Sequence, residues 1–306
     1  MKMLELNSTV ETIAQERLAR RKFLTRAGLL GLGAAASFTL GGGSRVARAD
    51  ETESAGEAAQ EAAQAKDTVK EIFTAALIAE DLASTFYYNG LVGPVIQDPN
   101  LAGPGGSAKN VTSSGNAGNV QYLQAALTQE IHHAGLFRSL LGMQYARYDP
   151  VQTFYFPHGT FDTLSAFTGM LNALENAFIG AYLNAIQEFA AKSANKQSGD
   201  GAYLEPADAA YTTEQLNYFA KVSASIMGIE AEHRVLGRVI SNSNPANNLN
   251  YEGTDGINAV YNGPKSAVAA LTPFLTPSTG PGYSFTTVLN NQASVSIPIA
   301  GWQPSY

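Results

Sequence analysis

Two short stretches decide the fold of this chain, QEIHHA at residues 129–134 and GIEAEHR at residues 228–234. Each contains a glutamate followed three residues later by a histidine. Residues three apart lie on the same face of a helix, so each pair turns a carboxylate and an imidazole toward one point. Each pair is therefore half of a candidate metal site. The four residues are Glu130, His133, Glu230 and His233.

Both stretches lie in segments with the apolar period of an amphipathic helix. Two further segments have the same period, and in each of them one glutamate, Glu80 or Glu175, interrupts the apolar stripe. Connections rich in Gly, Asn, Pro and Ser separate the segments. The sequence therefore predicts four helices, at about residues 67–89, 119–141, 161–191 and 213–241.

The two halves of this region resemble each other. Glu80 stands seven residues before Tyr87, and Glu175 stands seven residues before Tyr182. The second and fourth segments share the spacing Glu-x-x-His-x-x-x-x-Arg, 100 residues apart. A duplicated helix pair is the simplest explanation of both repeats.

Four glutamates inside apolar stripes need compensating charge. Burying a carboxylate costs several kcal/mol unless a cation or hydrogen bonds compensate it, and no stripe offers a Lys or Arg. Two divalent cations would neutralise four carboxylates. A Glu from each of two helices, with Glu-x-x-His from each of the other two, is the ligand pattern of di-iron and di-manganese bundles. We therefore expect two metal ions, with the ligands Glu80, Glu130, His133, Glu175, Glu230 and His233.

From about residue 67 to residue 241, the chain resembles ferritin-like domain proteins, and specifically their desiccation-related branch of plants and bacteria. The resemblance is carried by AEDLASTFY at 79–87, LENAFIGAY at 174–182 and the two Glu-x-x-His stretches. It implies an all-α, ferritin-like four-helix bundle with a long crossover. It also implies that each of the six residues is a ligand of the family's metal centre.

The expected function follows from the metal ions. Carboxylate and imidazole suit both iron and manganese, so ligand type does not separate the two metals. One expectation is an oxidoreductase acting on oxygen or peroxide in oxidative or desiccation stress, by oxidising ferrous ion or by removing peroxide as manganese catalases of this fold do. The alternative is a non-enzymatic protective or metal-sequestering envelope protein. No residue is assigned a catalytic role, and no organic cofactor is expected.

The first 49 residues resemble a twin-arginine export signal. Paired Arg20 and Arg21 precede an uncharged run at residues 27–43, which is shorter than the roughly 20 residues of a membrane span. A small-x-small sequence ends at Ala49, which fits leader-peptidase cleavage. We expect recognition by the twin-arginine machinery, a periplasmic or extracellular mature chain without a membrane span, and a linker over residues 50–66.

Composition limits the expected partners. The chain has 306 residues with 19 Lys or Arg, 26 Asp or Glu and no Cys. Without residues 1–49, which hold eight of the basic and three of the acidic residues, the net charge is −12 (11 − 23). Such acidity disfavours nucleic acid, and the lack of cysteine excludes thiolate ligands and disulfides. The expected partners are metal ions with oxygen or peroxide, and homo-oligomer formation is left open.

Other polar residues are expected outside the ligand set. Tyr87 and Tyr182 are expected to be buried structural residues, with contact to the site or a radical role as alternatives. Arg138 and Arg238 lie near helix C-termini, where the helix dipole favours a cation. Four residues are expected off the metal-facing stripes or without a site role: Asp81, His132, His158 and Glu232.

The remaining regions are connections and a tail. Residues 90–118 are expected to form a long loop, and residues 141–160 are long enough to run the length of the bundle as a crossover. Residues 242–306 are expected to form an irregular C-terminal extension, an appended lobe with a short helix at 266–274. Two alternating stretches of the extension are expected to pair as a hairpin of short strands, 283–289 and 293–299.

Overall fold

The computed structural model describes only part of the chain. The described residues are 67–102, 118–199, 204–243, 246–247, 271–277 and 279–297. The expected export signal and linker, residues 1–66, lie outside them, as do residues 266–270 of the short helix expected in the extension. Among the described residues, no helix has both the length and the apolar composition that crossing a membrane requires.

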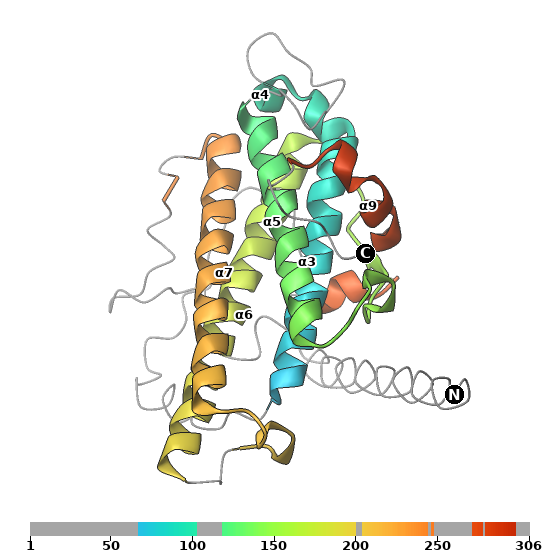
Figure 1. Cartoon of the computed structure of the whole chain (residues 1–306). Helices are drawn as coiled ribbons and strands as arrows, with labels where there is room; N and C mark the ends of the chain where they lie inside the picture. Colours follow the sequence, from blue (N-terminus) through green and yellow to red (C-terminus); the bar gives the residue numbers. More distant parts are fainter. Residues whose placement is uncertain are drawn as a thin grey trace, which may run out of the picture.

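Four long helices lie side by side as a bundle (Figure 1). They are α3 (Val69–Val92), α5 (Gly118–Leu140), α6 (Leu164–Ser198) and α7 (Thr213–Ile240). The most extensive contacts are those of α3 with α5 and of α6 with α7, so the bundle is built from two helical pairs. α5 and α6 run in the same direction, because the connection between them passes along the bundle. The predicted all-α four-helix bundle with a long crossover is confirmed.

Short elements occupy the connections and the extension. The α3 to α5 connection contains η1 (Pro94–Gln97) and α4 (Pro99–Ala102), and the crossover contains η2 (Ala146–Tyr148) and β1 (Thr153–Tyr155). η4 (Pro206–Asp208) precedes α7. The extension contains η6 (Thr272–Leu275), β2 (Gly282–Ser284), α9 (Phe285–Asn291) and η7 (Gln292–Ser294).

Threonines begin three of the bundle helices. The hydroxyls of Thr68 and Thr212 each accept a hydrogen bond from the backbone N–H three residues on, while Glu71 and Gln215 accept one from the threonine N–H in return. Thr163 caps α6 by accepting from a backbone N–H of its first turn. Each such cap stabilises its helix by about 1 kcal/mol. Local sequence therefore fixes where these three helices begin.

α6 is longer than the sequence predicts. Its predicted end at Ala191 is followed by polar residues, of which Lys192 is the first. In the structure Lys192 is buried and donates to Asp208 at 2.8 Å. The helix continues to Ser198 and stops at Gly199, whose left-handed backbone favours glycine. A buried ion pair therefore extends the helix through a polar stretch.

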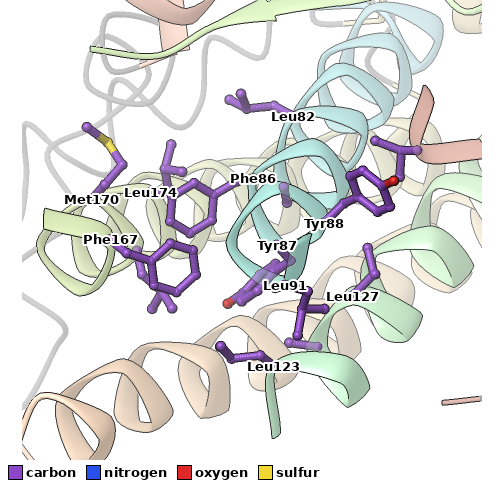
Figure 2. Close-up of a cluster of buried hydrophobic side chains, with 14 of the residues drawn as sticks. Leu82, Phe86, Tyr87, Tyr88, Leu91, Leu123, Leu127, Phe167, Met170 and Leu174 are labelled. Atoms are coloured by element: carbon purple, nitrogen blue, oxygen red, sulfur yellow. The ribbon is translucent and has the colours of Figure 1, made fainter. Parts of the chain in front are cut away.

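The hydrophobic core consists of two clusters. One surrounds Phe86 and Phe167 and includes the side chains drawn in Figure 2, and the other surrounds Phe73 and Phe219. Phe86 and Phe167 stack with ring centroids 4.5 Å apart. A Cβ at Gly90 would lie 2.4 Å from the Phe167 ring. α3 and α6 therefore approach closely at this level because position 90 is glycine.

The C-terminal extension differs from the prediction. Its two alternating stretches do not form a hairpin, because β2 pairs antiparallel with β1 of the crossover and most of the first stretch forms α9. Figure 1 shows α9 beside α3, on the side of the bundle away from α7. Phe285 and Val288 of α9 are buried in the core. A short alternating pattern does not separate a strand from a short helix that buries one side.

Hydrogen bonds also hold the extension against α5. Gln124 Nε2 donates to the carbonyl of Val295 at 2.7 Å. Thr128 Oγ1 donates to the carbonyl of Ile297 at 2.8 Å and accepts from its N–H at 3.1 Å. Both side chains are buried. The described part of the extension is therefore integrated into the bundle and is not a separate lobe.

Candidate metal centre

The structure brings the six expected ligands together in the interior of the bundle. They form two groups, and within each group the ligand atoms lie within 4.8 Å of one another. Two glutamates belong to both groups. The first group is Glu80, Glu130, His133 and Glu230, and the second is Glu130, Glu175, Glu230 and His233.

The centre forms a polar layer between the two hydrophobic clusters. On α3, Leu77 belongs to one cluster and Leu82 to the other, with Glu80 between them. The four glutamates are 0–2% exposed and His233 is 3% exposed, whereas the His133 side chain is 12% exposed. The surrounding apolar side chains therefore keep most of the layer away from water.

Glu130 and Glu230 occupy the middle of the layer. The two oxygens of Glu130 lie 3.6 Å from His133 Nδ1 and 2.9 Å from His233 Nδ1. The two oxygens of Glu230 lie 3.4 Å and 3.5 Å from the same two nitrogens. Each carboxylate thus presents one oxygen to each histidine. The two ligand groups therefore share two carboxylates.

Glu80 belongs only to the first ligand group and Glu175 only to the second. Each of them accepts a hydrogen bond from a tyrosine of the opposite helical pair. Glu80 Oε2 lies 3.2 Å from His133 Nδ1, and Glu80 Oε1 accepts a hydrogen bond from the Tyr182 hydroxyl. Glu175 Oε1 lies 3.9 Å from His233 Nδ1 and accepts from the Tyr87 hydroxyl at 2.6 Å. The tyrosines are buried, as expected, and they contact the site.

Burial and mutual attraction set the ionisation of these groups. Burial raises the pKa of the Glu80 and Glu175 carboxyls well above the usual range, and neighbouring carboxylates raise it further. Burial also acts to raise the pKa of Glu130, but the attraction of His233 and the hydrogen bonds of His133, His233 and Glu80 together outweigh burial, and the pKa is lowered. Burial acts to lower the pKa of both histidines, but the carboxylates raise it well above normal. Metal binding here would therefore release protons.

The donor set fits divalent metal ions. Four carboxylates face two histidines, and no described Lys or Arg forms an ion pair with them. A buried polar atom without a partner costs about 1–3 kcal/mol, and iron or manganese accepts carboxylate oxygen and imidazole nitrogen together. The buried ligand atoms without a hydrogen-bond partner among the described residues are both oxygens of Glu130, both oxygens of Glu230, Glu175 Oε2 and His233 Nδ1.

One residue at the site is missing from the sequence prediction. Gln129 of α5 accepts a hydrogen bond from His233 Nε2 at 2.9 Å. A hydrogen bond at Nε2, the ring nitrogen that faces away from the carboxylates, turns Nδ1 toward them. Gln129 directly precedes Glu130 in sequence, but a glutamine beside a helical ligand is common, so no sequence signal singles it out.

The residues expected off the stripes are absent from both ligand groups. Glu232 and His158 are exposed and His132 is half-buried. Asp81 is instead fully buried, where it accepts from Arg138 Nη2 at 2.7 Å. Arg138 lies in the last turn of α5, as expected, but it also donates through Nε to Asp149 at 2.6 Å. Its main partners are therefore two buried carboxylates.

The fold and the site together define a helical-bundle protein with a buried carboxylate and histidine centre that can hold metal ions. A family model described as the ferritin-like domain matches residues 68–217, so the chain carries a ferritin-like domain. The match covers α3, α5, α6 and the start of α7, and it stops before Glu230 and His233. No curated protein and no solved structure matches the chain.

Proposed function

We propose that this chain is an exported, di-metal carboxylate protein that uses two iron or manganese ions in oxidative or desiccation stress, either to oxidise ferrous ion or to remove hydrogen peroxide. The observation that carries the proposal is the sharing of Glu130 and Glu230 between the two ligand groups. Two adjacent redox-active ions, when bound, supply electron exchange with oxygen or peroxide. A desiccation-related role rests on the sequence resemblance.

The chain's own residues would bind, orient and insulate the reacting centre. Glu130 and Glu230 offer one oxygen to each position. Tyr87 fixes Glu175 through Oε1, and Glu175 Oε2 has no hydrogen-bond partner among the described residues. Tyr182 fixes Glu80 in the same way. The two apolar clusters exclude bulk water, which strengthens electrostatic interactions inside the site.

Two rate measurements test the activity. Protein loaded with Fe²⁺ under nitrogen is mixed with air-saturated buffer, and ferric absorbance is followed. Protein loaded with Mn²⁺ is mixed with hydrogen peroxide, and oxygen release is followed. The matched control is Glu130→Ala, which removes a shared carboxylate. In at least one of the two assays, we expect the rate of the parent chain to exceed that of Glu130→Ala by tenfold or more. Rates that are the same for the parent chain and the variant in both assays would contradict the enzymatic proposal.

The second candidate function is non-enzymatic metal sequestration or protection in the cell envelope. It is favoured by the closure of the centre, in which only His133 among the six ligands has a side chain more than 4% exposed. In that case the metal ions mainly stabilise the bundle. We would then expect a large rise in melting temperature on metal binding without turnover in either assay.

The proposal of export rests on residues 1–49 alone. It is tested by fusing these residues to a reporter that is active only outside the cytoplasm, beside the same fusion with Arg20→Lys and Arg21→Lys. We expect the reporter to be exported and the double substitution to stop it. Equal export of both fusions contradicts the twin-arginine route.

A further inference from the structure

The hydrogen bonds around the centre follow its internal repeat except at one place. In each half, a tyrosine donates to the glutamate of the opposite pair. The two histidines differ. His233 Nε2 donates to Gln129 at 2.9 Å, whereas the hydrogen bond of His133 is made by Nδ1, to Glu80 at 3.2 Å.

The sequence explains this difference. Gln129 stands directly before Glu130, and the residue in the same place before Glu230 is Ile229. An isoleucine side chain has no acceptor for an imidazole N–H. Exposure differs in the same sense, because the His133 side chain is 12% exposed and that of His233 is 4% exposed.

We propose that Gln129 is a positioning residue that makes the two metal positions unequal, so that the position of Glu175 and His233 binds its ion more tightly and fills first. The inference rests on the di-metal function proposed above. We call this the supported position, and we call the position of Glu80 and His133 the open position. Glu130 and Glu230 belong to both.

The physical reason is preorganisation. A hydrogen bond at Nε2 keeps the proton on that nitrogen, leaves the Nδ1 lone pair free for a metal ion and holds the ring in one orientation. His233 therefore has little rotational freedom to lose when an ion binds. No described residue makes a matching hydrogen bond to Nε2 of His133, and ordering that ring costs additional entropy. The open position should consequently be the one that exchanges its ion.

A titration with Co²⁺ tests the inference without any assay of activity. Cobalt bound by oxygen and nitrogen ligands absorbs visible light, and equilibrium dialysis counts the bound ions. We expect the full chain to bind two Co²⁺ in two resolved steps. Gln129→Leu should still bind two, with the tighter step weakened by about 10- to 100-fold, as is typical for loss of a hydrogen bond to a metal-binding histidine. Gln129→Glu retains an acceptor and should retain the tight step.

Two controls separate positioning from a general loss of structure. Gln121→Leu makes the same chemical change at an exposed position of α5, and it should leave both steps unchanged. In a His233→Ala background, Gln129→Leu should have no further effect, because its target ring is gone. In a His133→Ala background, it should still weaken the remaining ion. Circular dichroism establishes that each variant retains its helices.

The outcomes are distinct. Three results would overturn the inference about Gln129 and leave the di-metal function standing. They are two equal binding steps in the parent chain, an unchanged tight step in Gln129→Leu, and equal weakening of both steps in that variant. A folded parent chain that binds no Co²⁺, Fe²⁺ or Mn²⁺ rejects the di-metal function itself.

Discussion

Buried charge is compensated in two different ways within this bundle. Away from the centre, the chain supplies its own cations. Lys192 Nζ lies 2.8 Å from Asp208, and Arg138 Nη2 lies within 2.7 Å of both Asp81 and Asp149. At the centre, four buried glutamates face only two histidines, and no described Lys or Arg pairs with them.

The comparison shows what each region is for. Asp208 joins Lys192 of α6 to the first backbone N–H of α3, from which it accepts at 3.0 Å. Its charge is compensated inside the chain, so its role is structural. The chain leaves the carboxylates of the centre short of positive charge, so these groups either hold protons, as the raised pKa values of Glu80 and Glu175 indicate, or bind cations from outside.

The largest expected effect is that of removing a shared glutamate. Glu130 belongs to both ligand groups, so Glu130→Ala should reduce the bound metal from two ions per chain to at most one. Glu232→Ala is the matched control, because Glu232 lies on the same stretch of α7 as the ligands but is exposed. Elemental analysis of the two purified variants checks this. Equal metal loss in both would show that the assignment of helix faces is wrong.

The next effect is that of removing a cation supplied by the chain. Arg138→Met leaves two buried carboxylates without their cation, which should cost about 3–5 kcal/mol of unfolding free energy. Arg238, at the corresponding position of α7, donates to the carbonyl of Ala246 at 2.6 Å and is only part-buried. Arg238→Met should therefore cost about 1 kcal/mol. Urea unfolding of both variants decides, and similar losses would contradict the special role of Arg138.

A pH-dependent effect is expected at Glu188. Burial, with repulsion from Asp67, raises the pKa of Glu188 to about 7 from its ordinary 4.5, against an opposing effect of Lys192. A raised carboxyl pKa means that the folded chain holds the proton more tightly than the unfolded chain. Stability is therefore lost as the pH rises from 4.5 to 7 and is not lost further above that range.

Glu188→Gln removes this titration. Relative to the parent chain, the variant should gain up to about 3 kcal/mol at pH 8, and that gain should disappear near pH 4.5. Urea unfolding at the two pH values measures the difference. A gain that is the same at both would mean that Glu188 does not titrate as described.

The smallest effect concerns uncharged hydrogen bonds. Thr128→Val removes the bonds between α5 and Ile297 of the extension, and we expect a loss of about 1–2 kcal/mol with the metal content unchanged. Thr74→Val is the matched control, because the Thr74 hydroxyl donates to the carbonyl of Lys70 in its own helix. Thermal melts of the two variants check the difference. Equal melting temperatures would show that the extension contributes little to the bundle.

The fold and the ligand cluster were accessible from sequence because both depend on local spacing. The helical period of the apolar residues predicted the ends of the four helices to within a few residues, except at the end of α6. Glu-x-x-His needs only one helical turn to bring its two groups together, as for Glu130 and His133. The charge deficit of four stripe glutamates then indicated that the four helices share one centre.

The remaining features depend on contacts between residues far apart in sequence. The pairing of Lys192 with Asp208 needs the α6 to α7 connection to fold back, and nothing local indicates it. Asp149 comes from the crossover, so neither its burial nor that of Arg138 could be read from helical spacing. Gln129 accepts a hydrogen bond from a histidine 104 residues away. The extension was misassigned because its short apolar pattern fits either a strand or a helix.

Counting metal ions per chain tests the central claim most directly. The full chain is expressed with its first 49 residues intact, purified without added metal, and analysed for iron and manganese. We expect close to two ions per chain, and no more than one in Glu130→Ala prepared alongside. A folded chain that stays empty even after refolding with Fe²⁺ or Mn²⁺ would contradict the account and leave the six residues as a hydrogen-bonded polar core.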